Sequence, residues 1–515
     1  MSPDVRPYSK TYLVCGPKGT GKSTLCRFLL NHLLSCTQRQ KESTKTFEFF
    51  IDLDPGQPEY SAPGQISLMQ IPSFNLGVPF THSTSDNTEA SRIIRSHFLG
   101  ALSPRDDPEH YMRCAKDLVQ SCRRVSQSDP ALTVINCPGW IQGTGLEILE
   151  ELIQNTPVTD VIYTSTAGPE EVVGVLSKAC RKVNAFLHQI TSSSSQEVTR
   201  SASDLRTMQT MSYLHLAEPE GGNLYWDSQP LNYRTPMKLA FAGPKQAIFA
   251  VLILGGEQHP NHFPDILDGS ILGLVVVDDD RAFAPHDKTS HVPISDDHIE
   301  KLPVGPSNEQ RDTTPTYPDT AVRSTETPQY ATPLRSRHDI PYLPATNRST
   351  RPLAPEYSSC IGQAFIQSID LESESKCFNL ITPVPPSELV HHSRSGKKLV
   401  LVRGNLDTPA WAYKEEFEYL RSRRTKPKKT KGDNPGVEID RERDHGGANE
   451  KEKGEEEEEG RVEGDEDEDV DEDEVLRGWV QRQPWLSVSE IGTKRAKARK
   501  IRKDIRYRPQ GGDGT

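Results

Sequence analysis

The sequence predicts an α/β fold in which helices cover both faces of a doubly wound, mostly parallel sheet. A small, mostly β module and segments without a packed core are expected to follow. Two observations support this prediction. Short apolar runs alternate with helical patterns from Thr11 to Leu187, as in successive strand–helix–strand units. After Val277 the composition changes to Pro, Ser, Thr, Asp and Arg, with few apolar residues.

The first strand–helix–strand unit contains the strongest motif of the chain. Tyr12–Cys15 is an apolar run typical of a buried strand, and a helical pattern follows Thr24. The residues between them match G-x-x-x-x-G-K-[ST], a phosphate-binding loop whose backbone N–H groups surround an anion at a helix N-terminus. The motif predicts that Lys22 reaches the β- and γ-phosphates of a nucleoside triphosphate and that Ser23 holds Mg²⁺. The nucleotide-binding residues are Gly16, Pro17, Lys18, Gly19, Thr20, Gly21, Lys22, Ser23 and Thr24.

Two carboxylates stand at the end of the second predicted strand. Phe47–Asp54 is largely apolar and ends in Asp52 and Asp54, directly before a Pro-Gly-Gln-Pro turn. Alternate residues of a strand point to the same side, and ligands of a parallel sheet bind at the carboxyl ends of its strands. Both carboxylates are therefore expected to face the phosphate-binding loop. A turn or helix-capping role accounts for one Asp but poorly for the pair.

The later elements continue the alternation. Strands are expected at 131–136, 160–164, 247–254 and 270–277, and helices at 109–125, 145–154, 169–187 and 205–215. Four regions follow from this pattern: a phosphate-binding domain (1–277), a disordered linker (278–355), a small β-rich domain (356–420) and a disordered charged tail (421–515).

Charge and cysteine content limit the class of protein. The net charge is −12, but residues 455–474 hold 15 Asp/Glu and one Arg, so the remainder is −12 + 14 = +2. A nearly neutral body with an acidic tail does not exclude a polyanionic partner. The nine Cys form no CxxC pair and no zinc-site spacing, which favours reduced thiols inside the cell. No apolar run is long enough for a membrane span, and a soluble protein is expected.

Three motifs together resemble the polynucleotide 5′-hydroxyl kinase family. They are the phosphate-binding loop Gly16–Ser23, the run Asp52–Gln65 (DLDPGQPEYSAPGQ) and Ile135–Trp140 (INCPGW). The DPGQPE run, the Pro-Gly-Trp, and the C-terminal Leu399–Gly404 and Thr408–Trp411 are similar to the nucleolar branch of that family. The resemblance covers about residues 10–275 and 356–415.

The resemblance implies transfer of the ATP γ-phosphate, with Mg²⁺, to the 5′-hydroxyl end of RNA, or of DNA in some members. For the nucleolar branch it implies action in pre-ribosomal RNA processing, in the nucleus and nucleolus. There an endonuclease partner cuts the second internal transcribed spacer and leaves a 5′-hydroxyl, and the kinase product is what a 5′→3′ exonuclease requires.

The resemblance also implies roles for individual residues. Phosphoryl transfer needs charge neutralisation, an in-line acceptor and a base. We favour Asp54 as the base, because it lies beyond the strand end, and Asp52 as the metal-side residue, with the opposite assignment still open. Gln57 resembles a residue that orients the acceptor, and Arg206 resembles a lid arginine over the phosphates, with Arg200 as a second candidate and a solvated surface arginine as the alternative.

A segment that the family uses as a clasp on the nucleic acid matches Cys137–Trp140. Gly139 and Trp140 would contact RNA, and an exposed Trp offers a base a stacking surface worth roughly 1–3 kcal/mol. A core tryptophan is the alternative. The chain has Cys137 where the family usually has Thr, so a hydroxyl that could bind a phosphate is replaced by a weak thiol donor.

Two other functions fit the phosphate-binding loop. A non-catalytic ATP-binding scaffold of an RNA-processing complex gains some support from Cys137, whereas the complete set Lys22, Ser23, Asp52 and Asp54 favours an enzyme. A GTPase would carry an [NT]-K-x-D motif after the loop, and none is present. The family usually has an N-terminal β domain, which we expect this chain to lack, and the basic stretch Lys494–Arg508 could bind RNA or direct nuclear import.

Overall fold

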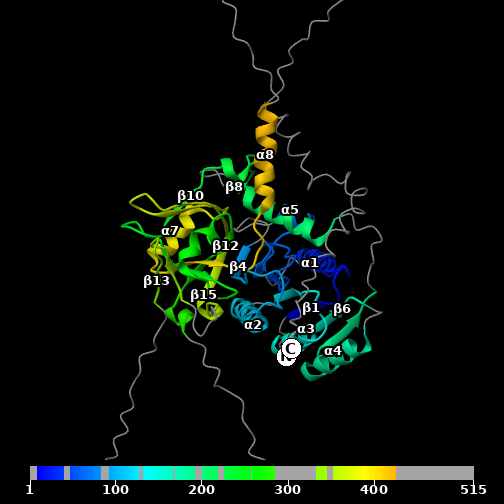
Figure 1. Ribbon diagram of the computed structural model, residues 1–515. Helices are drawn as coiled ribbons and strands as arrows, with labels where there is room; N and C mark the ends of the chain where they lie inside the picture. The colour runs from blue at the N-terminus through cyan, green and yellow to red at the C-terminus, as the bar shows by residue number, and fades with distance from the viewer. Residues whose placement is uncertain are drawn as a thin grey trace, which may run out of the picture. The chain divides into compact units, whose positions relative to one another are not determined.

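Figure 1 shows the protein as a computed structural model, coloured from the N-terminus to the C-terminus. The structure describes residues 9–39, 47–82, 92–126, 131–165, 169–191, 200–217, 225–256, 258–284, 332–344 and 352–424. These residues form two compact units, of which the first comprises 1–227 and 234–409.

The first unit contains a seven-stranded sheet, whose first strand leads into the phosphate-binding loop. Its strands are β1 (Lys10–Cys15), β2 (Phe47–Asp52), β3 (Gln65–Gln70), β4 (Arg92–Phe98), β5 (Ala131–Asn136), β6 (Asp160–Tyr163) and β7 (Phe186–Gln189). The spatial order is β4-β3-β2-β5-β1-β6-β7, and only β3 runs against the others. The carboxyl ends of β1, β2, β4 and β5 therefore meet at one edge, which we call the catalytic edge.

Helices cover both faces of this sheet, as the sequence predicts. The helices are α1 (Lys22–Arg39), α2 (Pro108–Val125), α3 (Thr144–Asn155) and α4 (Glu170–Val183). Leu13 and Ile135 pack with α2, α3 and α4, whereas their neighbours Val14 and Val134 pack with α1 on the opposite face. This alternation along each strand is what buries both faces and produces near-continuous apolar strands.

A fifth helix leans on the turn that follows β2. Helix α5 (Ala202–His215) begins with a capping box formed by Ser201 and Asp204. Its buried Gln209 donates hydrogen bonds from Nε2 to the Pro58 and Ser61 carbonyl oxygens, at 2.6 and 2.7 Å. The helix is thereby fixed to the Asp52–Gln65 run. The two-stranded sheet of β8 (Leu216–Ala217) and β9 (Tyr225–Trp226) follows it.

The second sheet corrects the predicted domain boundary. It has eight strands in the order β10-β16-β15-β12-β17-β11-β14-β13. Their bounds are β10 (Met237–Ala240), β11 (Ile248–Ile253), β12 (Ile271–Val277), β13 (Leu334–Arg335), β14 (Pro341–Tyr342), β15 (Ser358–Asp370), β16 (Cys377–Ile381) and β17 (Lys398–Arg403). Strands 237–277 therefore pair with the predicted 356–420 module, not with the first sheet, because their apolar faces complete that module's core.

The predicted linker is partly ordered. Its described parts form the 3₁₀ helices η4 (Asp280–Phe283) and η5 (Pro355–Tyr357) and strands β13 and β14. Phe283, Ile340 and Leu353 are buried in the cores of the second sheet, so a few well-placed apolar residues order a polar segment. The prediction of disorder is wrong for these parts. The rest of 278–355 lies outside the described residues.

The two large sheets of the first unit pack through β4 and β15. Ser96 donates from Oγ to the Cys360 carbonyl oxygen at 2.6 Å. Gly100 and Gly404 approach so closely that a Cβ on Gly404 would lie 2.2 Å from the Gly100 carbonyl oxygen. This contact needs glycine on both sides, and it ties the carboxyl end of β4 to the carboxyl end of β17.

The remaining helices complete the list of described elements. They are η1 (Pro79–Thr81), η2 (Leu231–Tyr233), η3 (Pro260–His262), α6 (Phe263–Leu267), α7 (Pro386–Arg394) and α8 (Ala410–Arg424). None of the helices in the described ranges is long and apolar enough to span a membrane.

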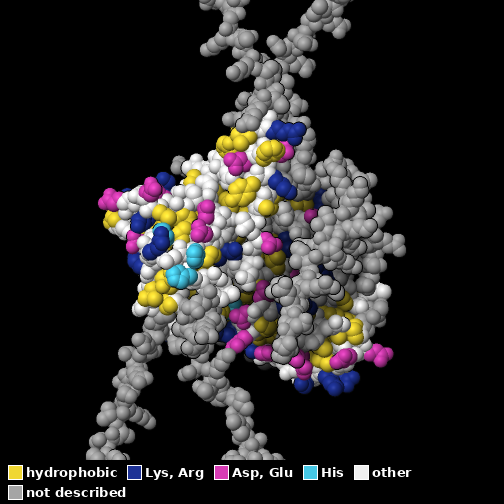
Figure 2. Space-filling view, in the orientation of Figure 1, with side chains coloured by type: hydrophobic (Ala, Val, Ile, Leu, Met, Phe, Trp, Pro, Cys, Tyr) yellow, Lys and Arg dark blue, Asp and Glu magenta, His cyan; other side chains and the backbone are white. Residues whose placement is uncertain are grey.

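The second unit comprises 228–233 and the chain from Ala410 onward. Its helix α8 was not predicted, since the sequence placed 410–420 in a β-rich domain and 421–424 in a disordered tail. Tyr419 of α8 packs on Tyr233, with ring centroids 5.0 Å apart, and Asn232 donates to Glu416 at 2.7 Å. Other apolar side chains of α8 remain exposed, and Figure 2 shows hydrophobic surface there. Residues 425–515, with the acidic run and the last basic stretch, lie outside the described part of the chain.

Candidate nucleotide and acceptor site

The phosphate-binding loop connects β1 to α1 in the way the sequence predicts. Gly19 and Gly21 have φ angles of 82° and 85°, a left-handed conformation that side chains disfavour. A Cβ on Gly16 would lie 2.3 Å from Thr164 Oγ1. Thr164, at the carboxyl end of β6, also shares a 2.6 Å hydrogen bond with the Thr20 hydroxyl. The loop is thus held from the neighbouring strand, a partner that the motif alone did not reveal.

Lys22 lies within this loop. Its side chain is buried, and its ammonium donates to the Pro17 carbonyl oxygen at 2.9 Å. Burial lowers the pKa of Lys22, and the nearby Asp54 carboxylate opposes this shift. The only buried ammonium of the loop is therefore placed where phosphate oxygens would bind, on the side that faces the carboxylates after β2.

Asp52 is fully buried and accepts hydrogen bonds with both oxygens. Oδ1 accepts from the Asp54 N–H at 3.2 Å and from Asn136 Nδ2 at 3.0 Å, and Oδ2 accepts from the Glu59 N–H at 2.6 Å. Burial raises the pKa of Asp52 to about 8, although these hydrogen bonds oppose the shift. Asn136 ends β5 directly opposite Asp52 and also reaches Ser23 Oγ at 3.5 Å.

This group fits a divalent cation. Ser23 and Asp52 offer hard oxygen atoms, which Mg²⁺ prefers, and the Asn136 amide Nδ2 donates to both and holds them together at the catalytic edge. A buried carboxylate whose pKa is raised by desolvation gains most from a nearby positive charge. Asn136 was missed as a site residue, and its place at the end of the INCPGW strand was the available signal.

Asp54 is held differently from Asp52. Its Oδ1 accepts from the backbone N–H groups of Gly56 and Gln57, at 2.9 and 3.3 Å, which closes the Pro-Gly-Gln turn. Its Oδ2 has no hydrogen bond to any residue that the structure describes. Burial raises the pKa of Asp54, and the charge of Lys22 opposes that shift. The two carboxylates thus differ in available oxygens, which favours Asp54 as the group that accepts a proton.

Gly139 and Trp140 lie beside the phosphate-binding loop. A Cβ on Gly139 would lie 2.9 Å from the Lys18 Cα, so the segment touches the loop backbone. Trp140 is half-buried at the edge of the core, and the Arg105 guanidinium lies 4.9 Å from its ring centroid. The stacking surface that we expected to be exposed is therefore partly covered by Arg105, a residue of the β4–α2 loop that no sequence motif singles out.

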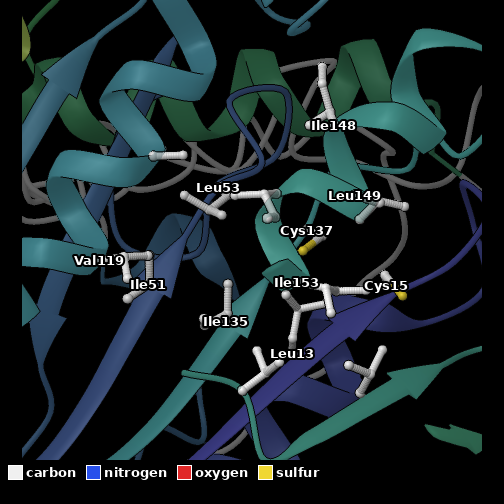
Figure 3. Close-up of a cluster of buried hydrophobic side chains, with 14 of the residues drawn as sticks. Leu13, Cys15, Ile51, Leu53, Val119, Ile135, Cys137, Ile148, Leu149 and Ile153 are labelled. Atoms are coloured by element: carbon white, nitrogen blue, oxygen red, sulfur yellow. The ribbon is translucent and has the colours of Figure 1, made fainter. Parts of the chain in front are cut away.

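Cys137 does not belong to the polar surface of the segment. Its side chain is fully buried, and Figure 3 shows the sulfur pointing into the cluster that includes Leu53, Leu149 and Ile153. Burial raises the pKa of this thiol well above its usual value. A side chain in this position faces the core, so the expected loss of a phosphate contact does not apply to Cys137.

Comparison with known proteins agrees with these features. Residues 16–216 match the family described as mRNA cleavage and polyadenylation factor CLP1 P-loop. The polynucleotide 5′-hydroxyl-kinase grc3 of Aspergillus clavatus is 37% identical over 80% of this chain and 50% of its own length. The corresponding protein of Gibberella zeae is 34% identical over 79% of this chain and 51% of its own length. This chain is thus similar in sequence to the fungal polynucleotide 5′-hydroxyl-kinases. It spans about half the length of the curated relatives it matches.

The chain also resembles solved structures, at lower sequence identity. The structure of the wild-type Clp1p–Pcf11p complex aligns with a TM-score of 0.41 and 15% identity, covering 76% of this chain and 74% of that one. A likeness of this size supports no conclusion about the site.

The remaining predicted residues, Gln57 and the two arginines, lie in or near the turn after β2. Gln57 is half-buried, and its N–H belongs to the Asp54 turn. Arg206 is half-buried on α5, one turn before the anchoring Gln209, and its side chain makes no hydrogen bond or ion pair with the described phosphate-loop residues. Arg200 lies before the helix and outside it. The structure thus brings Lys22, Ser23, Asp52 and Asp54 together. Arg206 would join them only after a closing movement of α5, and otherwise it is a surface residue.

Proposed function

We propose that this chain is an ATP-dependent polynucleotide 5′-hydroxyl kinase that acts on RNA. The observation that supports this most directly is Asp54, whose Oδ2 has no hydrogen bond within the described residues and whose carboxylate lies near enough to the buried ammonium of Lys22 for the two charges to interact. A hydrolase switch would need a residue that positions water, whereas this carboxylate is suited to accept a hydroxyl proton. The names of the fungal relatives support the same assignment.

The proposed reaction is an in-line displacement. The 5′-hydroxyl oxygen bonds to the γ-phosphorus as the bond to the β–γ bridging oxygen breaks, its proton passes to Asp54 Oδ2, and ADP leaves. Lys22 and the N–H groups of the loop hold the phosphates, and Arg206 adds positive charge if α5 closes. Mg²⁺, when bound through Ser23 and Asp52, would neutralise charge on the phosphate oxygens.

Finer parts of the proposal follow the nucleolar resemblance. We propose that the acceptor is the 5′-hydroxyl end left by an endonuclease partner in the second internal transcribed spacer, and that the protein works in the nucleolus. The DPGQPE and Pro-Gly-Trp runs, which resemble that branch, support this part of the proposal. The scaffold alternative loses its specific support, because Cys137 lies in the core rather than at the acceptor surface.

Transfer of label from γ-labelled ATP to a 5′-hydroxyl RNA oligonucleotide tests the function. We expect labelled RNA with the wild type, none with Lys22→Ala, and a slower reaction with a matched DNA oligonucleotide. ATP binding is measured in parallel by equilibrium dialysis. Bound ATP without any transfer to RNA or DNA would contradict the kinase and favour the scaffold.

A further inference from the structure

A cavity of about 300 Å³ lies next to the loop that joins β4 to α2. Beside the start of α2 and Pro352, three separate segments contribute to its lining: the β4–α2 loop, the turn after β11 and the turn after β17. Gly100, Ser103 and Asp106 come from the first, Gly255 from the second and Asn405 from the third. Its volume is at the lower end of the range for small-molecule sites.

The cavity lies toward the catalytic edge. Strand β4 is parallel to β2, so the loop after β4 leaves the sheet on the same edge as the Asp52–Asp54 pair. Only β3 lies between β2 and β4, which places the two carboxyl ends roughly 10 Å apart at the usual strand spacing. An acceptor strand that leaves Asp54 toward β4 would thus reach the cavity a few nucleotides from its 5′ end.

The β4–α2 loop connects the cavity to the acceptor site. On one side its Leu102 carbonyl oxygen lies 2.8 Å from where a Cβ on Gly56 would be, in the Asp54 turn. On the same loop Arg105 covers the ring of Trp140. The neighbouring Ser103 and Asp106 line the cavity. One short loop therefore contacts the catalytic turn, the stacking residue and the cavity.

The lining suits a nucleoside rather than a phosphate. Pro104, Leu254 and Pro352 offer apolar surface for a base, and Ser103, Asp106 and Asn405 offer hydrogen-bonding groups for its edge or for a ribose hydroxyl. The Asp106 carboxylate would repel a phosphate inside the cavity. Arg105, exposed on the same loop, is the cation available to a phosphate outside it.

We propose that this cavity binds one nucleoside of the acceptor RNA, downstream of the nucleotide that carries the reacting 5′-hydroxyl. Arg105 then contacts the RNA backbone between Trp140 and the cavity. The inference rests on the proposed function for the identity of its ligand. It adds a second recognition point, so that the site holds the acceptor strand and not only its end.

Binding of 5′-hydroxyl RNA hexamers carrying a 3′ fluorophore, followed by anisotropy, tests the proposal without any need for transfer. A series of hexamers with one abasic position each should show one downstream position at which loss of the base weakens binding to the wild type. Asn405→Trp fills the cavity from an exposed position. We expect it to weaken binding of the intact hexamer roughly tenfold and to abolish the effect of that abasic position.

Two further variants support the comparison. Asp407→Trp adds the same side chain two residues away, at an exposed position that does not line the cavity, and should bind like the wild type. Asp106→Ala changes an exposed lining residue without filling the volume and should weaken binding about threefold; it decides the matter if Asn405→Trp has a lowered unfolding midpoint.

Three results would overturn the cavity proposal. The first is unchanged RNA binding by both Asn405→Trp and Asp106→Ala, and the second is a wild type whose binding is insensitive to every downstream abasic position. The third is that the two variants lose affinity for ATP instead of affinity for RNA. The last would assign the cavity to the nucleoside of ATP. Absence of label transfer together with cavity-dependent RNA binding would instead reject the kinase and keep the cavity.

Discussion

Asp52 and Asp54 are two residues apart, and their hydrogen bonds give them different chemistry. Asp52 has both oxygens engaged in a fully buried network, whereas Asp54 engages only Oδ1 within the described residues. A group that receives a proton needs an accessible oxygen, and a group that holds a cation needs fixed ones. These different environments support our proposal that Asp54 is the base and Asp52 the metal-side residue.

Replacement of the base should remove both rate and pH dependence. Because a base must be ionised and burial raises the pKa of Asp54, kcat/KM of the wild type should fall as the pH drops through that raised value. Asp54→Asn should lower kcat roughly 10²- to 10⁴-fold and lose this acidic decline, with ATP affinity retained. A pH–rate profile that keeps its acidic decline in the variant would assign the base elsewhere.

Asp52 should couple the cation to pH. Its pKa is raised to about 8, and a neutral carboxyl binds Mg²⁺ poorly, so ionisation above that pH favours the cation. The rise in thermal unfolding midpoint caused by Mg²⁺ with a non-hydrolysable ATP analogue should therefore grow as the pH increases from 6 to 9. Asp52→Asn should show a small rise at every pH. An equal increase with pH in both proteins would contradict the assignment.

At the scale of elements, α5 combines an anchor with a candidate catalytic arginine. Gln209 satisfies two buried carbonyl oxygens of the turn after β2, and Arg206 lies one helical turn away on the same face. Loss of the first should disturb structure and loss of the second should disturb chemistry. The two substitutions therefore separate the roles.

Arg206→Ala should lower kcat roughly 100-fold or more, because it removes positive charge from the transition state, while the unfolding midpoint stays that of the wild type. Gln209→Ala should lower the free energy of unfolding by about 1–3 kcal/mol, because two buried carbonyl oxygens lose their hydrogen-bond donor. Label transfer and urea denaturation measure the two effects. A wild-type kcat in Arg206→Ala would place that arginine on the surface, which is the alternative that the sequence leaves open.

At the scale of the first unit, the two sheets are joined where β4 meets β15 and where Gly100 meets Gly404. The predicted boundary at residue 277 divides the second sheet, because strands 237–277 pair with strands 358–403 across the intervening segment. A chain ending at 277 would leave the apolar faces of β11 and β12 without partners.

A methyl group at the junction tests whether the sheets act together. Gly404→Ala places a Cβ against the Gly100 backbone, where neither strand end can move freely. We expect it to lower the free energy of unfolding by about 1–3 kcal/mol. Hydrogen exchange should increase in both β4 and β17. Gly174→Ala in α4 is the matched control, since its Cβ meets nothing within 4 Å and should be neutral or slightly stabilising. Faster exchange confined to β17 would show that the sheets open separately.

Local sequence patterns were enough to predict the parts of this protein that depend on neighbouring residues. The loop Gly16–Ser23, the strand ending in Asp52 and Asp54, and the alternation of apolar runs each follow from local spacing, and so predict the parallel sheet and its nucleotide site. Tertiary structure alone decided what depends on distant segments. The pairing of strands 237–277, the contact of Asn136 with Asp52 and the position of Arg105 over Trp140 all involve residues far apart in the chain. Cys137 is likewise buried by residues from several segments. Such contacts are selected by how whole faces pack, which no local pattern records.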